Sequence, residues 1–421
     1  MFEYVISGSA FFKVVYKEAQ EDPENLEFFR HAFGSLQNTH NHVVSILYNA
    51  YTEKHIGKSL KDPYKKIGGI HNVYADSGGL QVITLGKQLT EELKNKVFEN
   101  QAASADVGLT FDEIPVKTIG DRSARLELNT RIYDPALLEP CARQTGKNLR
   151  RQIEIFNKTN STCRPMLIVQ GNTYDDYMRW TELILEELPA DYVQYVGGVA
   201  MGAAALGHGT LEDIKRAFYY TQLPIDLTHK HLHLLAVGSI YRMLPNMVFI
   251  KNGLYDGVHL SYDSTTHSSG VAQGRYFMKN SHGIGKLFIF DRNFDNRYRV
   301  IHEDIKRQFP EFKVSLEDFH RCLNVSPRKL EALGHSVNPS IQTYEAFVAG
   351  AVGNFIAEVD RASKSMTSII AVADKVDKAA LQSLYDVKTT DDFRVWEKDV
   401  GKFLNTVPVR EHIGSLEGLF A

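Results

Sequence analysis

The sequence predicts an α/β fold: a closed parallel TIM (β/α)8 barrel with insertions and a C-terminal helical extension. Short β-type runs recur along the chain, and each ends in a polar or glycine-rich cluster. Helix-type stretches separate these runs, and strand-type patterns stop near residue 340. Such alternation is typical of parallel sheets, whose functional side chains gather where the strands end. A doubly wound open sheet is the alternative architecture.

The β-type runs come in a fixed order. The most informative is HNVYADSGGLQV, in which an apolar stretch ends in Asp76-Ser77-Gly78-Gly79. It is followed by LTFDEIP, PMLIVQGN, VQYVGGVAMG, HLHLLAVGS and VHLSYDSTTHS. Helices are expected at about 88–104, 137–158 and 175–187. We expect residues 1–339 to form the barrel domain and residues 340–421 a helical extension packed on it.

Composition bounds the class of protein. A chain of 421 residues that is 43% hydrophobic and 24% charged can bury a large core. Glu3 and Lys13 interrupt what would otherwise resemble a signal peptide, and no apolar run is long enough for a membrane span. Three widely spaced cysteines argue against a disulfide framework. We therefore expect a cytoplasmic protein, or one in the host cytoplasm if phage-encoded, with no membrane partner.

In order and content, the run endings resemble the tRNA-guanine transglycosylase superfamily. The strands of that family end in DSGG(F/L)Q, FDE, VQG, GG(L/V)AxG, (M/A)VG and FDS. The resemblance covers roughly residues 45 to 275 of this chain. It implies a barrel enzyme that exchanges a purine base on a nucleic acid.

Base exchange with retention needs a carboxylate nucleophile and a second group that handles the proton of the leaving base. The resemblance implies that Asp76 is the general acid/base and Asp263 the nucleophile. Asp256, which follows Tyr255, is the alternative nucleophile. Residues 262–276 (YDSTTHSSGVAQGRY) run without a gap along the archaeal-type pattern FDSAxYxLxxxxGRY, and this register favours Asp263.

A base pocket follows from the chemistry of guanine, which offers donors at N1 and N2 and an acceptor at O6. The ionised carboxylate of Asp112 is expected to accept both donors. Donors to O6 are expected from Gln170 and from the backbone amide of Gly198. Further substrate contacts are expected from Ser77, Gly197 and the ring-clamping pair Leu80 and Leu235.

Two departures from the family pattern concern the nucleic acid and the metal. The family zinc site, Cys-x-Cys-x2-Cys with a distant His, is matched here only by His320, Cys322 and His335, so we expect no metal and no cofactor. His267-Ser268-Ser269-Gly270 stands where bacterial-type enzymes carry Thr-Arg-x-x-Arg to grip tRNA. Together the departures resemble the DpdA-type DNA-guanine transglycosylases, which place 7-deazaguanines into DNA.

The expected partners are therefore DNA and a free 7-deazaguanine base, with tRNA as the alternative nucleic acid. A divergent tRNA-guanine transglycosylase and a non-catalytic partner subunit with the same barrel are the alternative functions. The sequence leaves a homo-oligomer open. Basic residues interleaved with aromatics are the expected phosphate contacts, and they are Arg275, Lys279, Arg297 and Arg299.

The identity of the incoming base can also be predicted. Family members that insert an aminomethyl-deazaguanine read GGLAVGE, and the terminal glutamate matches the cationic amine. Ala203 stands at that position here. A cation that enters a pocket without a counter-charge loses hydration without compensation, whereas a neutral nitrile does not. We predict that 7-cyano-7-deazaguanine (preQ0) is preferred in a competition for incorporation into DNA; preference for the amine would contradict this.

Overall fold

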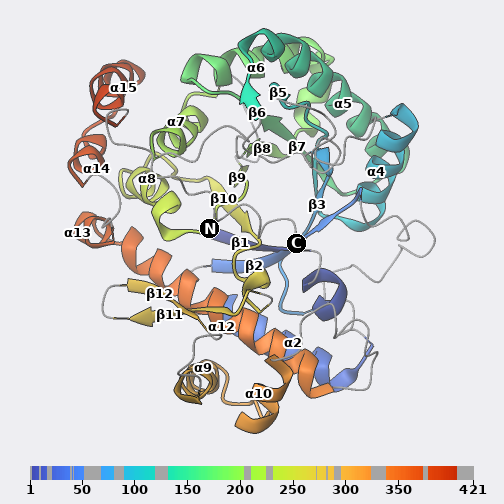
Figure 1. The fold of residues 1–421 in the computed structure, drawn as a ribbon. Coiled ribbons are helices and arrows are strands. Elements are labelled where there is room, and N and C mark those ends of the chain that lie inside the picture. The colour runs from blue at the N-terminus through green and yellow to red at the C-terminus, as the bar shows by residue number, and fades with distance from the viewer. Residues whose placement is uncertain are drawn as a thin grey trace.

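A closed barrel of eight parallel strands forms the centre of the molecule, and helices surround it (Figure 1). The computed structural model describes residues 2–8, 11–16, 21–37, 40, 42–51, 68–79, 90–118, 131–202, 210–223, 231–271, 273–280, 283–288, 295–323, 338–372 and 378–404. The predicted TIM barrel is thereby confirmed, and the open-sheet alternative is wrong because the last strand pairs with the first.

The barrel strands follow one another around the barrel in chain order. Each neighbouring pair is parallel, so the carboxyl ends of all eight strands meet at one rim. The strands are β1 (Phe2–Ser7), β2 (His42–Asn49), β3 (Val73–Asp76), β4 (Val107–Leu109), β7 (Arg164–Val169), β8 (Gly198–Met201), β9 (His231–Leu234) and β10 (His259–Ser264).

Helices that follow the strands form the outer layer. They are α2 (Pro23–Gln37), α4 (Glu91–Ser104), α5 (Leu138–Lys158), α6 (Tyr174–Glu186), α7 (Thr210–Thr221), α8 (Ile240–Lys251) and α12 (Asn338–Ser363). The three helices expected from the sequence correspond to α4, α5 and α6. Their starts are set locally: the Thr90 side chain caps α4, and Thr173 and Asp176 form a capping box at α6.

Additional segments interrupt or extend this pattern. After β4 comes the hairpin of β5 (Val116–Thr118) and β6 (Arg131–Tyr133). Short helical turns are η1 (Phe11–Tyr16), η4 (Pro135–Leu137), η5 (Ala190–Tyr195) and η6 (Ser268–Gly270). Between β10 and α12 lie the hairpin of β11 (Arg275–Asn280) and β12 (Gly283–Phe288), then α9 (Asp295–Gln308) and α10 (Leu316–Leu323).

The C-terminal part is helical, as predicted. Helix α12 packs against both α2 and α8. It is followed by α13 (Met366–Ala371), α14 (Lys378–Tyr385) and α15 (Thr390–Leu404), which lie along the left side of Figure 1. The division into two domains at residue 339 stays a prediction. Among the described residues, no helix combines the length and apolar character that a membrane crossing requires.

Alternation along the strands separates two apolar clusters. Val5, Leu47 and Tyr74 belong to the smaller cluster, with Val107, Leu109, Met166, Ile168 and Ala200. Their strand neighbours, such as Tyr4 and Ile46, belong to the larger cluster, which also contains the helix side chains. Because successive strand residues face opposite sides, the smaller cluster fills the barrel interior. Residues two positions further along a strand therefore face inward as well.

Docking of the C-terminal helices can be tested at Phe393 of α15. Its buried ring stacks on Phe218 of α7, with centroids 4.1 Å apart and planes 7° apart. We expect Phe393→Ala to lower the free energy of unfolding by about 3 kcal/mol, because a buried aromatic ring is lost. Urea denaturation measures this. Val395→Ala is the matched control, since Val395 on the same helix is 62% exposed; equal stability of both variants would contradict the docking.

Candidate active site

Three acidic side chains and one amide lie at the carboxyl-terminal rim of the barrel. Asp76 is the last residue of β3, two positions after the inward-facing Tyr74. Asp263 lies near the end of β10, and Gln170 directly follows β7. Asp112 follows β4 after a short connection. The rim thus brings together residues that are far apart in the sequence.

Asp76 is held in place by neighbouring donors. Asn49, at the end of β2, donates from Nδ2 to Asp76 Oδ2 over 3.2 Å, and the backbone N–H groups of Ser77 and Gly78 also donate to the carboxylate. Gly78 has a φ of 80°, and a Cβ there would lie 2.6 Å from Tyr51 Cβ. Glycine is therefore required for this turn.

The ionisation of Asp76 is shifted toward neutrality. Burial, together with the negative charges of Asp112 and Asp263, raises the pKa of Asp76 to about 7, although hydrogen bonds from Gly78 and Ser77 act in the opposite direction. Asp76 as a whole residue is half-buried at the rim. A carboxyl group that titrates near pH 7 can both give and take a proton, as general acid–base catalysis requires.

Asp112 and Gln170 form a buried pair. Gln170 Nε2 donates to Asp112 Oδ2 over 2.6 Å, and burial raises the pKa of Asp112 to about 6. Gly79 and Gly202 pack closely against this pair. A Cβ on Gly79 would lie 2.9 Å from Asp112 Oδ1, and a Cβ on Gly202 would lie 2.3 Å from Gln170 Nε2. Gln170 Oε1 is buried without a hydrogen-bond partner. The pair therefore retains hydrogen-bonding capacity for a ligand.

Asp263 faces donors from the neighbouring strand. The backbone N–H of Ala236 donates to Asp263 Oδ1 over 2.8 Å, and His233 Nε2 lies 3.6 Å from the same oxygen. Ala236 has a φ of 57°, which is unusual for a residue with a Cβ. Such strain persists where surrounding structure fixes it, and here it directs an amide at a carboxylate. His233 was not singled out in the sequence, because a histidine inside a strand carries no motif.

Gly197 and Gly198 do not join the rim, contrary to the expected role of the Gly198 amide. Gly198 is the first residue of β8 and pairs with Met166, whereas Gly202 lies beyond the carboxyl end. Gly202 lies four residue steps after Gly198, a rise of roughly 13 Å along a strand. Gly198 is instead fixed by close packing, since a Cβ there would lie 2.3 Å from the His231 carbonyl oxygen. Gly202 is the glycine beside Gln170.

Of the other expected substrate contacts, some lie at or near the rim and some lie outside the described residues. Ser77 is fully buried at the rim, and its Oγ has no hydrogen-bond partner. Leu235, just after β9, packs against the interior cluster. Leu80 lies outside the described residues, as does Ala203. The aliphatic clamp of Leu80 and Leu235 thus stays a prediction.

Asp256, the alternative nucleophile, lies in the exposed turn between α8 and β10. It precedes β10, so it lies at the opposite end of that strand from Asp263. The geometry therefore groups Asp263, and not Asp256, with Asp76 and Asp112.

The basic residues expected at phosphates lie in the segments inserted after β10. Arg275 and Lys279 are on β11, and Arg297 and Arg299 are on α9, where Arg299 is exposed. His320 and Cys322 lie on α10, with Cys322 buried, and His335 lies outside the described residues.

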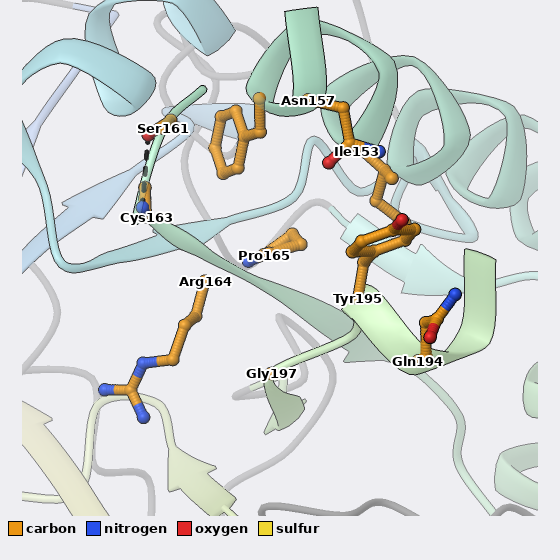
Figure 2. Close-up of a pocket in the computed structure, with 10 residues that line it drawn as sticks. Ile153, Asn157, Ser161, Cys163, Arg164, Pro165, Gln194, Tyr195 and Gly197 are labelled. Atoms are coloured by element: carbon orange, nitrogen blue, oxygen red, sulfur yellow. Dashed lines mark hydrogen bonds between the residues drawn. The ribbon is translucent and has the colours of Figure 1, made fainter. Parts of the chain in front are cut away.

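A hollow of about 210 Å³ lies away from these carboxylates (Figure 2). It is lined by α5 and by the residues at the starts of β7 and β8, including Arg164 and Gly197. Figure 2 shows Tyr195 beside Ile153, with the Arg164 side chain directed away from them. Because strand starts lie at the amino-terminal end of a parallel barrel, this hollow is separate from the rim that holds Asp76.

The chain was compared with protein-family models and with curated proteins. No family model matches it, and no curated protein matches it significantly.

The raised pKa of Asp76 predicts a pH-dependent gain in stability for Asp76→Asn. The folded protein holds this proton up to about pH 7, whereas an unfolded aspartate loses it near pH 4. Stability is therefore lost between these values as pH rises, and the variant escapes this loss. We expect the variant to gain about 1 to 2 kcal/mol more at pH 8 than at pH 5, after allowance for screening by water.

Urea denaturation at the two pH values measures this gain. The exposed Asp256 provides the control variant Asp256→Asn, for which the same difference at both pH values is expected. A gain for Asp76→Asn that does not grow with pH would show that ionisation of this carboxyl does not lower the free energy of unfolding.

Proposed function

We propose that the protein is a guanine transglycosylase that exchanges guanine in DNA for a 7-deazaguanine, with preQ0 as the incoming base. The observation that carries the proposal is the meeting of Asp76, Asp112 and Asp263 at one rim of a parallel barrel. Their proximity is reflected in the raised pKa of Asp76. The sequence motifs that resemble the transglycosylase superfamily supply the same three residues.

The strand order supports a placement of these side chains around the proposed base. β10, which carries Asp263, lies four strands from β4, which precedes Asp112, so the two are on opposite sides of an eight-stranded barrel. Asp76 on β3 is next to β4. A guanine held at its N1 and N2 edge by Asp112 would thus direct its glycosidic bond toward Asp263, with Asp76 alongside the ring.

The first displacement would open the glycosidic bond. A carboxylate oxygen of Asp263 attacks C1′ of the sugar as the C1′–N9 bond breaks. Protonated Asp76 donates its proton to the leaving guanine. The products are free guanine, an ionised Asp76 and a covalent sugar ester on Asp263.

The second displacement would reverse these roles. Ionised Asp76 takes the N9 proton of the incoming 7-deazaguanine, whose N9 attacks C1′ and expels the Asp263 carboxylate. Two inversions at C1′ give net retention, as in retaining glycosidases. Charge and protons balance, because the proton that Asp76 gave to guanine is replaced by one from the new base.

Access to C1′ requires that the target nucleotide leave the base stack. Basic residues on β11 and α9 are suited to hold the sugar-phosphate backbone, because they place positive charge beside the phosphates on a protein whose net charge is -3. DNA is proposed over tRNA because the family zinc pattern and the Thr-Arg-x-x-Arg stretch are both missing from the sequence.

The nucleophile assignment gives a direct test. With labelled guanine and either DNA or tRNA, we expect the parent enzyme to incorporate label into DNA. In Asp263→Ala this incorporation should fall at least 1,000-fold, roughly the effect of losing a covalent nucleophile. Asp263→Asn should form no covalent DNA adduct on a denaturing gel. Asp76→Ala should also lose turnover, because neither base then has a proton partner.

Asp256→Ala is the matched control and should retain full exchange. Loss of exchange in that variant with near-normal turnover in Asp263→Ala would overturn the assignment. Incorporation into tRNA alone would favour a divergent tRNA enzyme. Exchange that requires a second barrel protein would favour the partner-subunit alternative.

A further inference from the structure

A second group of ionisable side chains lies inside the barrel at its amino-terminal end. Glu3 is on β1, His231 is the first residue of β9, and His259 is the first residue of β10. These strands are neighbours, and His259 pairs with His231 in register. One ligand-type atom from each of the three residues lies within 4.8 Å of the others.

The carboxylate of this group is oriented by several donors. Glu3 is fully buried, and it accepts hydrogen bonds from Asn72 Nδ2 over 2.9 Å, from Tyr74 OH over 2.7 Å and from Ser45. Outer donors that hold a carboxylate in one orientation are typical of metal sites, where they fix the ligand.

The two histidines have buried nitrogen atoms without hydrogen bonds. Nδ1 of His231 has no hydrogen-bond partner, and Nε2 of His259 lies 2.8 Å from Glu3 Oε2 without hydrogen-bond alignment. On its other side, His231 Nε2 lies 2.7 Å from Ser261 Oγ. If Ser261 accepts the Nε2 proton, the buried Nδ1 carries a lone pair, which is the form that binds a metal.

We propose that Glu3, His231 and His259 bind a divalent transition-metal ion, with Zn²⁺ the best match. Two imidazoles and one carboxylate are a common zinc ligand set, with water as the fourth ligand. Tetrahedral ligands at ~2.0–2.1 Å stand ~3.3 Å apart, so Glu3 and His259 need to separate by about half an ångström. The rings of His231 and His259 stack with centroids 4.4 Å apart and planes 8° apart, so one ring must also turn before a nitrogen lone pair of each faces the same ion. His259, with 17% of its side chain exposed, gives the ion a path from solvent.

This site is distinct in position from that of the proposed base exchange, since it lies at the other end of the barrel from Asp76. Its bound ion would join β1, β9 and β10, and so stabilise the seam where the barrel closes. Binding of the metal to the folded chain alone would raise the thermal midpoint.

Zinc titration of the purified full chain tests the proposal after dialysis against a chelator. Isothermal titration calorimetry should show one Zn²⁺ per chain, and Co²⁺ should give the absorption bands of a four- or five-coordinate ion. Zn²⁺ should raise the thermal midpoint. Glu3→Gln and His259→Ala should each weaken Zn²⁺ binding by at least 100-fold and abolish the shift.

The control is His31→Ala on α2, because His31 is 58% exposed and lies 2.9 Å from Glu311. It should bind Zn²⁺ as the parent does. If either ligand variant fails to fold, the Co²⁺ spectrum of the parent decides. The proposal is overturned if the parent binds no Zn²⁺, if Co²⁺ stays six-coordinate, or if folded Glu3→Gln and His259→Ala bind as tightly as the parent; Glu3 and His259 would then form an ion pair without a metal.

Discussion

Closure of eight short strands into one barrel forces every second side chain of each strand into a single enclosed interior. In this protein the interior is divided. Strands β2, β4, β7 and β8 contribute apolar side chains such as Leu47, Leu109 and Ile168, whereas β9 and β10 contribute histidines, Ser261 and Asp263. Burial is the main cause of the raised pKa values of Asp76 and Asp112 at the rim of this interior, and neighbouring negative charges add to it.

Much of the fold and part of the candidate site were predictable from the sequence. The charged and amide side chains of the predicted strand endings lie at the carboxyl-terminal rim, as Asp76, Asp112 and Gln170 illustrate. A parallel barrel allows this prediction, because position after a strand fixes position in space. The roles of these residues are not settled by position and stay predictions.

Prediction was weaker where a run of apolar residues left the strand boundaries open. VQYVGGVAMG was read as a β-type run with a glycine-rich end, yet the strand begins only at Gly198, and residues 190–195 form the turn η5. Pairing of β8 with β7 and β9 decides this register, and no local pattern reveals it. Glu3, His231 and His259 were likewise hidden, since only barrel closure brings β1 beside β10.

The polar half of the interior connects its two ends through specific hydrogen bonds. Ser261 Oγ lies 2.7 Å from His231 Nε2 and 2.8 Å from His233 Nδ1. Its single proton can be donated to only one of them. If His231 donates to Ser261 and Ser261 donates to His233, then His233 bears its own proton on Nε2, the atom that lies 3.6 Å from Asp263.

That arrangement gives the two carboxyl groups of the proposed reaction different surroundings. Asp263 accepts a hydrogen bond from the Ala236 amide and lies 3.6 Å from His233 Nε2. Asp76 faces the negative charges of Asp112 and Asp263, which favour a bound proton. The environment of Asp76 is thus the one that suits the proposed acid, which must hold its proton near neutral pH.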